Sequence, residues 1–120
     1  MPRIDPHSFL PLAPQDLQLL LAVSDDPLHG YGMMKMVEEQ SAGALRVELG
    51  SLYRMIQRLE RDGLMEQAPG GDRSRAPGRD RRFYRITRLG RAVVAAELDR
   101  LRGVIELAGS RRLRAREASP

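Results

Sequence analysis

The stretch from Leu49 to Gly63 constrains the fold of this chain more than any other. At about 100° per residue, a helix through it gathers apolar side chains on one face and turns cationic and amide groups the opposite way. Ser51 is predicted to cap the start of this helix, and Gly63 to end it in a left-handed conformation. The pattern fits a DNA-reading helix, but a solvated amphipathic helix fits it equally, so the neighbouring segments must decide. The apolar face holds Leu52, Met55, Ile56 and Leu59, and the opposite face holds Arg54, Gln57 and Arg61.

The charged residues favour a nucleic-acid partner. The chain has 20 Lys and Arg residues against 16 Asp and Glu, and Lys35 is the only lysine, so nearly all the positive charge is guanidinium. Arginine binds phosphate and guanine through paired hydrogen bonds. A GC-rich genome that encodes arginine in place of lysine is the alternative source of this bias. At 120 residues the chain is expected to form one small domain.

Missing residue types exclude several kinds of site. The chain has no cysteine, which rules out disulfides, thiolate metal sites and cysteine nucleophiles. It has no apolar run of the ~18 residues that a membrane helix needs, and its first residues do not follow the pattern of a secretory leader. We therefore predict a cytoplasmic protein that needs no cofactor and no metal.

The N-terminal part predicts an arm and then an apolar helix. Residues 1–12 are rich in proline and show no periodic pattern, so we expect a flexible arm with at most local order. A helix is expected from Pro14 to about Ser24, apolar nearly all round. Such a helix needs cover on two sides, and a partner subunit would supply the second. Its candidate interface residues are Leu17, Leu20 and Leu21.

The next segment completes a helix-turn-helix pattern. Residues 25–27, Asp-Asp-Pro, break the first helix, and His29-Gly30-Tyr31-Gly32 leads into a second helix that runs to about Ser41. The stretch that starts at Leu49 then follows at the spacing of a DNA-binding unit whose second helix lies in a groove.

Two short strands are expected over Leu64–Gln67 and Arg82–Thr87. The connection between them, Ala68–Arg81, is too long and too rich in glycine for a tight hairpin. Its charges are positive apart from Asp72 and Asp80, which favours a basic wing beside the reading helix; a surface loop without a partner is the alternative. The wing arginines are Arg73, Arg75, Arg79 and Arg81.

The last helix is predicted over residues 88–116, with the hydroxyl of Thr87 as its cap. Its apolar positions recur at alternating spacings of four and three, which makes a heptad seam. A helix of about twenty residues is about 30 Å long, longer than the small body it would cover, so part of the seam should contact another chain. The seam consists of Val94, Leu98, Leu101, Ile105 and Ala108. Residues 117–120 are expected to form a tail.

The expected order is three helices, a strand, a wing, a strand and a long helix, with a winged-helix domain over residues 13–87. This order and four motifs resemble the PadR family of winged-helix transcriptional regulators, in its shorter subgroup with a single C-terminal helix. The motifs are His29-Gly30-Tyr31-Gly32; Gly50-Ser51-Leu52-Tyr53; Leu59-Glu60 with Asp62-Gly63-Leu64; and Phe83-Tyr84-Arg85-Ile86-Thr87 with Gly90.

The resemblance implies a mainly α, α+β winged helix-turn-helix fold with a two-stranded wing and a long C-terminal dimerisation helix. It also implies a dimeric DNA-binding regulator, commonly a repressor, with dimer contacts from the first and last helices. Ala13 departs from the Ser or Thr cap that the family often has, and the wing is longer and richer in arginine than usual. Some members bind flat aromatic or phenolic molecules between subunits, so a small aromatic effector is a candidate partner.

We therefore predict a homodimer that binds a palindromic operator in double-stranded DNA. Arg54 and Gln57 are expected to read bases, because their forked groups suit guanine and adenine edges. Phosphate contacts are expected from Tyr53 and Arg58 on the flanks, from Arg61 near the C-terminal end and from the wing arginines. The predicted DNA surface also includes Ser51.

An enzyme and a protein-binding module are the two other classes of function to consider for this sequence. An enzyme is not expected, because His7 and His29 are far apart and Gly30-Tyr31-Gly32 lacks the third glycine of a dinucleotide fingerprint. The stronger alternative is a winged helix that binds an acidic protein partner through the same basic face. Competition by non-specific duplex DNA at moderate salt separates that alternative from DNA binding.

Overall fold

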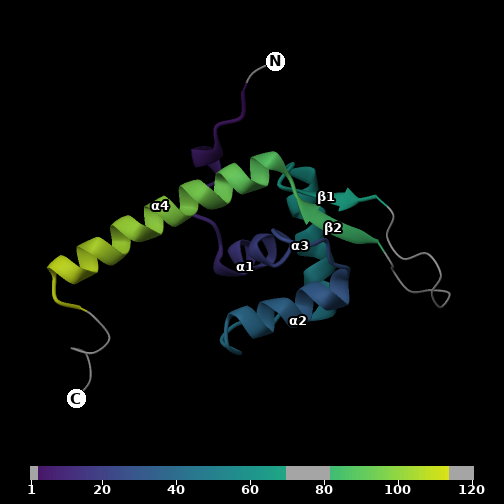
Figure 1. The fold of residues 1–120 in the computed structure, drawn as a ribbon, viewed down its shortest axis with the longest axis horizontal. Coiled ribbons are helices and arrows are strands. Elements are labelled where there is room, and N and C mark those ends of the chain that lie inside the picture. The colour runs from purple at the N-terminus through teal and green to yellow at the C-terminus, as the bar shows by residue number, and fades with distance from the viewer. Residues whose placement is uncertain (1–2, 70–81, 114–120) are drawn as a thin grey trace.

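The computed structural model describes residues 3–69 and 82–113. A compact group of helices and strands lies at one end of a long C-terminal helix, which extends away from it (Figure 1). This arrangement confirms the predicted class, mainly α with a two-stranded sheet. The elements in chain order are the 3-10 helix η1 (Pro6–Phe9), α1 (Pro14–Ala22), α2 (Gly30–Gln40), α3 (Leu49–Arg61), β1 (Met65–Ala68), β2 (Phe83–Ile86) and α4 (Arg88–Ser110).

The core forms where the apolar faces of the helices and the sheet meet. Both periodicities in the sequence, about 3.6 residues in the helices and two in the strands, deliver side chains to it. In β2, for example, Tyr84 and Ile86 are buried while Arg85 between them is exposed. The fully buried apolar members of the core are Leu19, Leu20, Val23, Met33, Val37, Leu52, Ile56, Leu59, Leu64, Met65 and Val93.

The helix starts use different devices. The His29 ring accepts a hydrogen bond from the Gly32 backbone N–H (3.1 Å) and so caps α2. Helix α1 starts after Ala13 without a side-chain cap, as the sequence suggested. The predicted Ser51 cap of α3 is wrong, because the helix begins at Leu49 with Glu48 as its N-cap, also without a side-chain cap bond. The preceding residue, Val47, is buried in the core, and that packing anchors the chain at the helix start.

The end of α3 is confirmed at Gly63. This residue has a φ of 80°, and its N–H donates to the Glu60 carbonyl at 3.0 Å. The Leu64 N–H donates to the Leu59 carbonyl at 2.9 Å. These two bonds satisfy the last carbonyls of the helix in a Schellman motif, whose left-handed position favours glycine.

The two strands pair antiparallel from Met65 opposite Ile86 to Ala68 opposite Phe83. Both predicted strands are therefore confirmed, with bounds shifted by a residue. Leu28, before α2, forms an isolated bridge with Tyr84 and ties the helix-turn-helix to the sheet. Most of the predicted wing lies outside the described residues, with all four wing arginines: Arg73, Arg75, Arg79 and Arg81.

Helix α4 ends at Ser110, six residues before the predicted position of 116. Arg112 takes a left-handed φ of 57°, and the Leu113 N–H donates to the Ala108 carbonyl at 2.9 Å, so a second Schellman motif closes the helix. The predicted tail, 117–120, lies outside the described residues. The first half of α4 is packed on the body, whereas the large apolar residues of its second half are exposed: Val104, Ile105 and Leu107.

The N-terminal arm is more ordered than predicted. Residues 6–9 form η1, which lies against α4, and Phe9, Leu10 and Leu12 pack on the core. The Leu12 backbone N–H donates to the Glu97 carboxylate of α4 at 3.3 Å. The arm packs on the core through a few separate side chains and not through a continuous apolar face. Its sequence therefore shows no helical or strand periodicity.

Candidate nucleic-acid interface

Helix α3 presents a cationic and amide face to solvent. Arg54, Gln57 and Arg61 are exposed, and together they form what we call the reading face. The side opposite is anchored in the core by Leu52, Ile56 and Leu59. The reading face therefore sits on a helix that cannot rotate without exposing its apolar side chains. At its N-terminal end, the Arg54 Nη2 donates to the Ser51 hydroxyl at 3.1 Å, so Ser51 orients Arg54 instead of capping the helix.

Tyr53 joins α3 to the first turn of α2. A Cβ added at Gly30 would lie 2.6 Å from the Tyr53 hydroxyl oxygen and 2.8 Å from the carbon that bears it. Only a residue without a side chain leaves room for the ring at this crossing. The half-buried Tyr53 thus helps to fix how α2 and α3 cross.

Arg58, predicted to meet a phosphate, is engaged inside the protein. Its Nη1 and Nη2 donate to the two carboxylate oxygens of Asp16 in α1, at 2.9 and 2.7 Å. The hydrogen bonds from Asp16 raise the pKa of Arg58 above its usual range. Sequence reasoning missed this pair, because Asp16 lies 42 positions away and reads as an ordinary acidic residue in a first helical turn.

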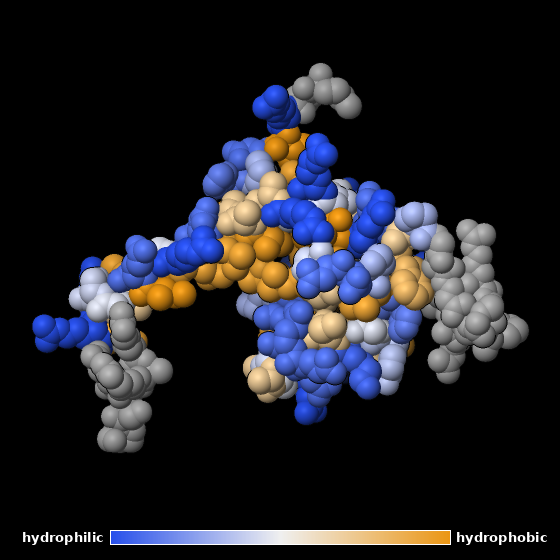
Figure 2. Space-filling model, in the orientation of Figure 1, coloured by the Kyte–Doolittle hydropathy of each residue, from blue (hydrophilic) through white to orange (hydrophobic). Residues whose placement is uncertain are grey.

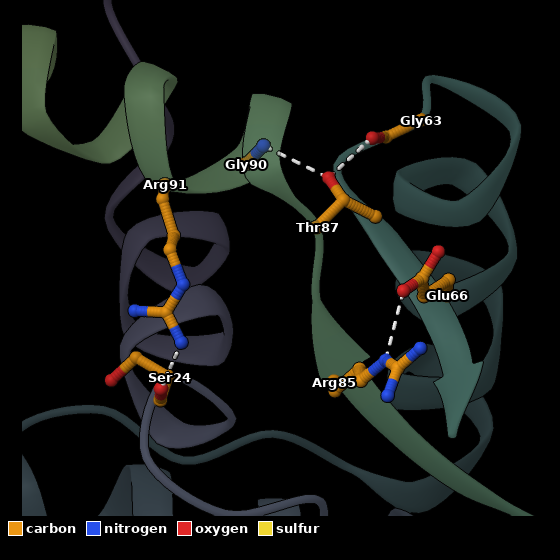
Figure 3. A network of polar contacts seen from close by, with 7 residues as sticks. All are labelled: Ser24, Gly63, Glu66, Arg85, Thr87, Gly90 and Arg91. Atoms are coloured by element: carbon orange, nitrogen blue, oxygen red, sulfur yellow. Dashed lines mark hydrogen bonds and ion pairs between the residues drawn. The ribbon is translucent and has the colours of Figure 1, made fainter. Parts of the chain in front are cut away.

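The C-terminal end of α3 is joined to the start of α4 by one hydroxyl group (Figure 3). Thr87 Oγ1 donates to the Gly63 carbonyl at 2.6 Å and accepts the Gly90 N–H at 2.9 Å. The predicted Thr87 cap is confirmed, and the same group also binds the turn that directly follows α3. Gly90 lies so close to the backbone of Leu64 that an added Cβ would clash with it. The end of α3 and the start of α4 are therefore held in one geometry.

Two more polar contacts surround this junction (Figure 3). Arg91 Nη2 donates to the Ser24 carbonyl at 2.6 Å, so α4 also binds the chain just after α1. Arg85 and Glu66 are paired in the register of the sheet, with Arg85 Nε donating to Glu66 at 2.8 Å. Cross-strand pairs of opposite charge stabilise a sheet.

The predicted dimer residues fall into three groups. Leu20 is 0% exposed and Val94 is buried, so both serve the core of their own chain and have no surface left for a partner. Ile105, in the projecting half of α4, is 70% exposed. Figure 2 shows a band of hydrophobic surface along the edge of α4 from the body toward its free end. The half-buried members are Leu17, Leu21, Leu98 and Leu101.

A buried carboxylate, Glu97, lies on α4 beside the arm and was not predicted. Its side chain is 2% exposed and accepts two hydrogen bonds from Arg100, at 2.7 and 2.9 Å, besides the one from Leu12. The hydrogen bonds from Arg100 hold the pKa of Glu97 below its usual value, although burial opposes the shift. The spacing of three residues between Glu97 and Arg100 is the signal in the sequence that could have suggested the pair.

Membrane spans and clusters of metal ligands are two other features that the described part of the chain lacks. No helix in residues 3–69 and 82–113 is long and apolar enough to span a membrane. Within the same ranges, no three His, Cys, Asp or Glu side chains are gathered as a metal site would need.

Comparisons with known proteins agree with this geometry. The sequence model of the "Transcriptional regulator PadR-like family" matches residues 19–96. "Transcriptional regulator Rv3488" of Mycobacterium tuberculosis (strain ATCC 25618 / H37Rv) is 35% identical over 81 residues, which cover 68% of this chain and 69% of that protein.

Solved structures share the fold at lower identity. A transcriptional regulator from Clostridium thermocellum superposes with a TM-score of 0.65 at 20% identity, covering 80% of this chain and 87% of that one. A PadR family transcription regulator from Clostridium difficile R20291 gives 0.66 at 15% identity, covering 82% and 97%. The chain has the winged-helix fold and an exposed cationic face on α3, and the family model matches it over residues 19–96. It therefore belongs to the PadR-like family of transcriptional regulators.

Proposed function

We propose that this protein is a homodimeric repressor that binds a palindromic operator with the two copies of α3 in successive major grooves. The observation that carries the proposal is the two-sided character of α3. Arg54, Gln57 and Arg61 are exposed on a helix whose other side buries Leu52, Ile56 and Leu59 and half-buries Met55. A two-fold dimer places two such helices about 34 Å apart, one turn of duplex DNA.

The dimer part of the proposal is supported by α4. Its second half extends beyond the body and exposes Ile105, Val104 and Leu107, which a monomer would leave in water. A helix pair along the heptad seam would cover Ile105 together with the half-buried Leu98 and Leu101.

Within the DNA surface we assign base reading to Arg54 and Gln57. Both are exposed in the middle of α3, and the contact with Ser51 directs Arg54 along the helix surface. Arg61, near the C-terminal end of α3, and the wing arginines are assigned to phosphates. Tyr53 stays in this surface as a half-buried neighbour of Arg54.

The test begins with selection of bound sequences from random duplex DNA, followed by Arg54→Ala. Loss of one bidentate base contact should cost about 1 to 3 kcal/mol on the selected operator and much less on random DNA. Arg102→Ala is the matched control, because Arg102 is an exposed arginine on α4 outside the DNA surface. Equal loss on operator and random DNA would show that α3 only positions the protein on the backbone. Failure of the wild type to select any sequence would refute the proposal as a whole.

The wing has its own test. Arg73→Ala or Arg75→Ala should weaken operator and random DNA alike and reduce the salt dependence by about one ion per contact, doubled in a dimer. Release from DNA by a planar aromatic effector is the part of the proposal that rests on the family resemblance alone. A screen of planar aromatics for a shift in melting temperature, followed by DNA-binding assays with any stabilising compound, tests it.

A further inference from the structure

Asp16 is an acidic side chain placed inside the protein and fully engaged by one partner. It lies in the first turn of α1, its side chain is 9% exposed, and both of its oxygens accept hydrogen bonds from Arg58 of α3. A carboxylate and a guanidinium joined by two parallel bonds fix their mutual distance and also the plane they share. The pair therefore holds α3 against rotation more strictly than apolar contacts alone.

Arg58 is also part of the helix that carries the reading face. It directly follows Gln57 and lies one turn after Arg54 along the same rigid helix. A rotation of α3 by about 15° at a side-chain radius of about 6 Å displaces a group by about 1.5 Å. Such a rotation would break the bonds at Asp16 and would move Arg54 and Gln57 out of register with base edges, since a functional group must be held within roughly 0.5 Å.

The Asp16–Arg58 pair connects two helices, α1 and α3, whose backbones are not each other's main packing partners. The backbone of α1 packs mainly against α2 and α4, so Asp16 reaches past these contacts to bind α3 directly. The side chain of Arg58 keeps 43% of its surface exposed, so contact with a phosphate is the alternative role that an experiment must exclude.

We infer that Asp16 and Arg58 form a positioning clamp for DNA recognition. Arg58 orients the reading face by binding Asp16 inside the protein, and Asp16, too buried to reach DNA, controls operator affinity through it. The inference rests on the proposed role of α3 in reading DNA. It replaces the sequence-based expectation that Arg58 meets a phosphate.

Asp16→Asn tests the clamp with little change in shape. The amide keeps one oxygen acceptor but loses the charge and the second acceptor that Arg58 requires. Asp99→Asn is the matched control, because Asp99 pairs with Arg102 on the exposed side of α4 and its loss changes the net charge equally. Asp16→Asn should weaken operator binding about tenfold, within the range that one bidentate base contact discriminates. Its affinity for random DNA and its salt dependence should match those of Asp99→Asn.

If Arg58 instead contacts DNA, Asp16→Asn should change the DNA affinity in the opposite direction. If Arg58 binds a phosphate, releasing it from Asp16 should tighten operator and random DNA together and steepen the salt dependence by about one ion per half-site. Either that result or equal operator affinities for Asp16→Asn and Asp99→Asn would overturn the clamp. Melting curves of both variants confirm that the proteins assayed are folded.

Arg58→Lys is a second variant that does not depend on Asp16→Asn being stable. Lysine keeps the positive charge for a phosphate but loses the planar fork that fits Asp16. A clamp predicts lower operator affinity at unchanged affinity for random DNA, whereas near-wild-type binding to both would contradict it. A failure of the proposed function itself is visible separately, because the wild type would then select no operator before any variant is made.

Discussion

The junction between α3 and α4 leads us to predict that replacing glycine with alanine has opposite effects on stability at two positions of α4, Gly90 and Gly103. At Gly90, an added Cβ would lie 2.7 Å from Ile86 Cγ1, 3.1 Å from the Leu64 carbonyl carbon and closer still to the Leu64 oxygen. The Leu64 carbonyl is backbone and accepts the Thr87 N–H at 3.1 Å, so it cannot turn aside. At Gly103, nothing lies within 4 Å of the added Cβ.

The loss of stability expected for Gly90→Ala depends on how the protein relieves the clash. Retained strain from overpacking costs about 1 to 3 kcal/mol. Moving α4 by about 1 Å instead stretches the Thr87 bonds to Gly63 and Leu64, which contribute about 1 kcal/mol each. Replacing a helical glycine with alanine returns at most about 1 kcal/mol. Because the clash is with backbone, we take the upper end of the strain, about 3 kcal/mol, and subtract the return of up to about 1 kcal/mol. Gly90→Ala should therefore lower the free energy of unfolding by about 2 kcal/mol, whereas Gly103→Ala should raise it by up to about 1 kcal/mol.

Thermal unfolding followed by circular dichroism measures both variants against the wild type. A difference of about 3 kcal/mol corresponds to about 10 °C in a domain of this size. All samples must be at one protein concentration, since the melting temperature of a dimer depends on it. If Gly90→Ala melts at or above the wild-type temperature, the close approach of α4 to Leu64 is not a rigid feature. If Gly103→Ala destabilises as much as Gly90→Ala, the effect belongs to the helix in general and not to the junction.

Two other predictions concern α4. Ile105→Glu should convert the proposed dimer to a folded monomer, because Ile105 is exposed in the single chain and burying such a side chain between subunits contributes about 1.5 to 3 kcal/mol. Sedimentation measures the molecular mass, with Glu106→Ala as the control at a neighbouring exposed site. A wild type that sediments at 13.5 kDa at micromolar concentration would contradict the prediction. Glu97→Gln should make stability less sensitive to acid. Because the pKa of Glu97 is lowered in the folded state, its contribution is present above the usual carboxylate pKa of 4.5 and is lost as the pH falls below that value. The unfolding free energies of wild type and variant, measured by denaturation from about pH 7 to about pH 3, should therefore converge as the pH falls. A difference that stays constant over this range would contradict the role of Glu97.

The sequence predicts the features that depend on neighbours along the chain. Helical periodicity identified the buried and exposed sides of α3, and the stop at Gly63 and the cap at Thr87 follow from the backbone chemistry of glycine and threonine. The start of α3 was misplaced because Ser51 is the better cap by residue type, while the structure anchors the chain through buried Val47 instead. Statistical preference at a helix end is weaker than tertiary packing.

Features that depend on distant partners were not accessible in this way. Asp16 pairs with an arginine 42 positions away, which no local pattern indicates. The spacing of Glu97 and Arg100 suggests their ion pair, but nothing local shows that the Glu97 side chain is buried. Arg58 is expected to meet a phosphate because it lies on the flank of α3, and the sequence does not show that Asp16 lies beside that flank. The choice between the two roles depends on the variants proposed above. Leu20 was assigned to the dimer interface because apolarity alone does not separate a core side chain from one that a partner covers.

The projecting half of α4 has a consequence for how such a regulator can diverge after gene duplication. Its residues beyond Leu101 contribute no buried side chain to the body, whereas the reading face is supported by the body itself. Mutations in the projecting half therefore carry little folding cost for the single chain, and selection can change the proposed pairing surface while α3 stays as it is. With the dimer and the operator proposed above, a few substitutions around Ile105 would let two copies of this gene cease to pair with each other and still recognise the same half-site.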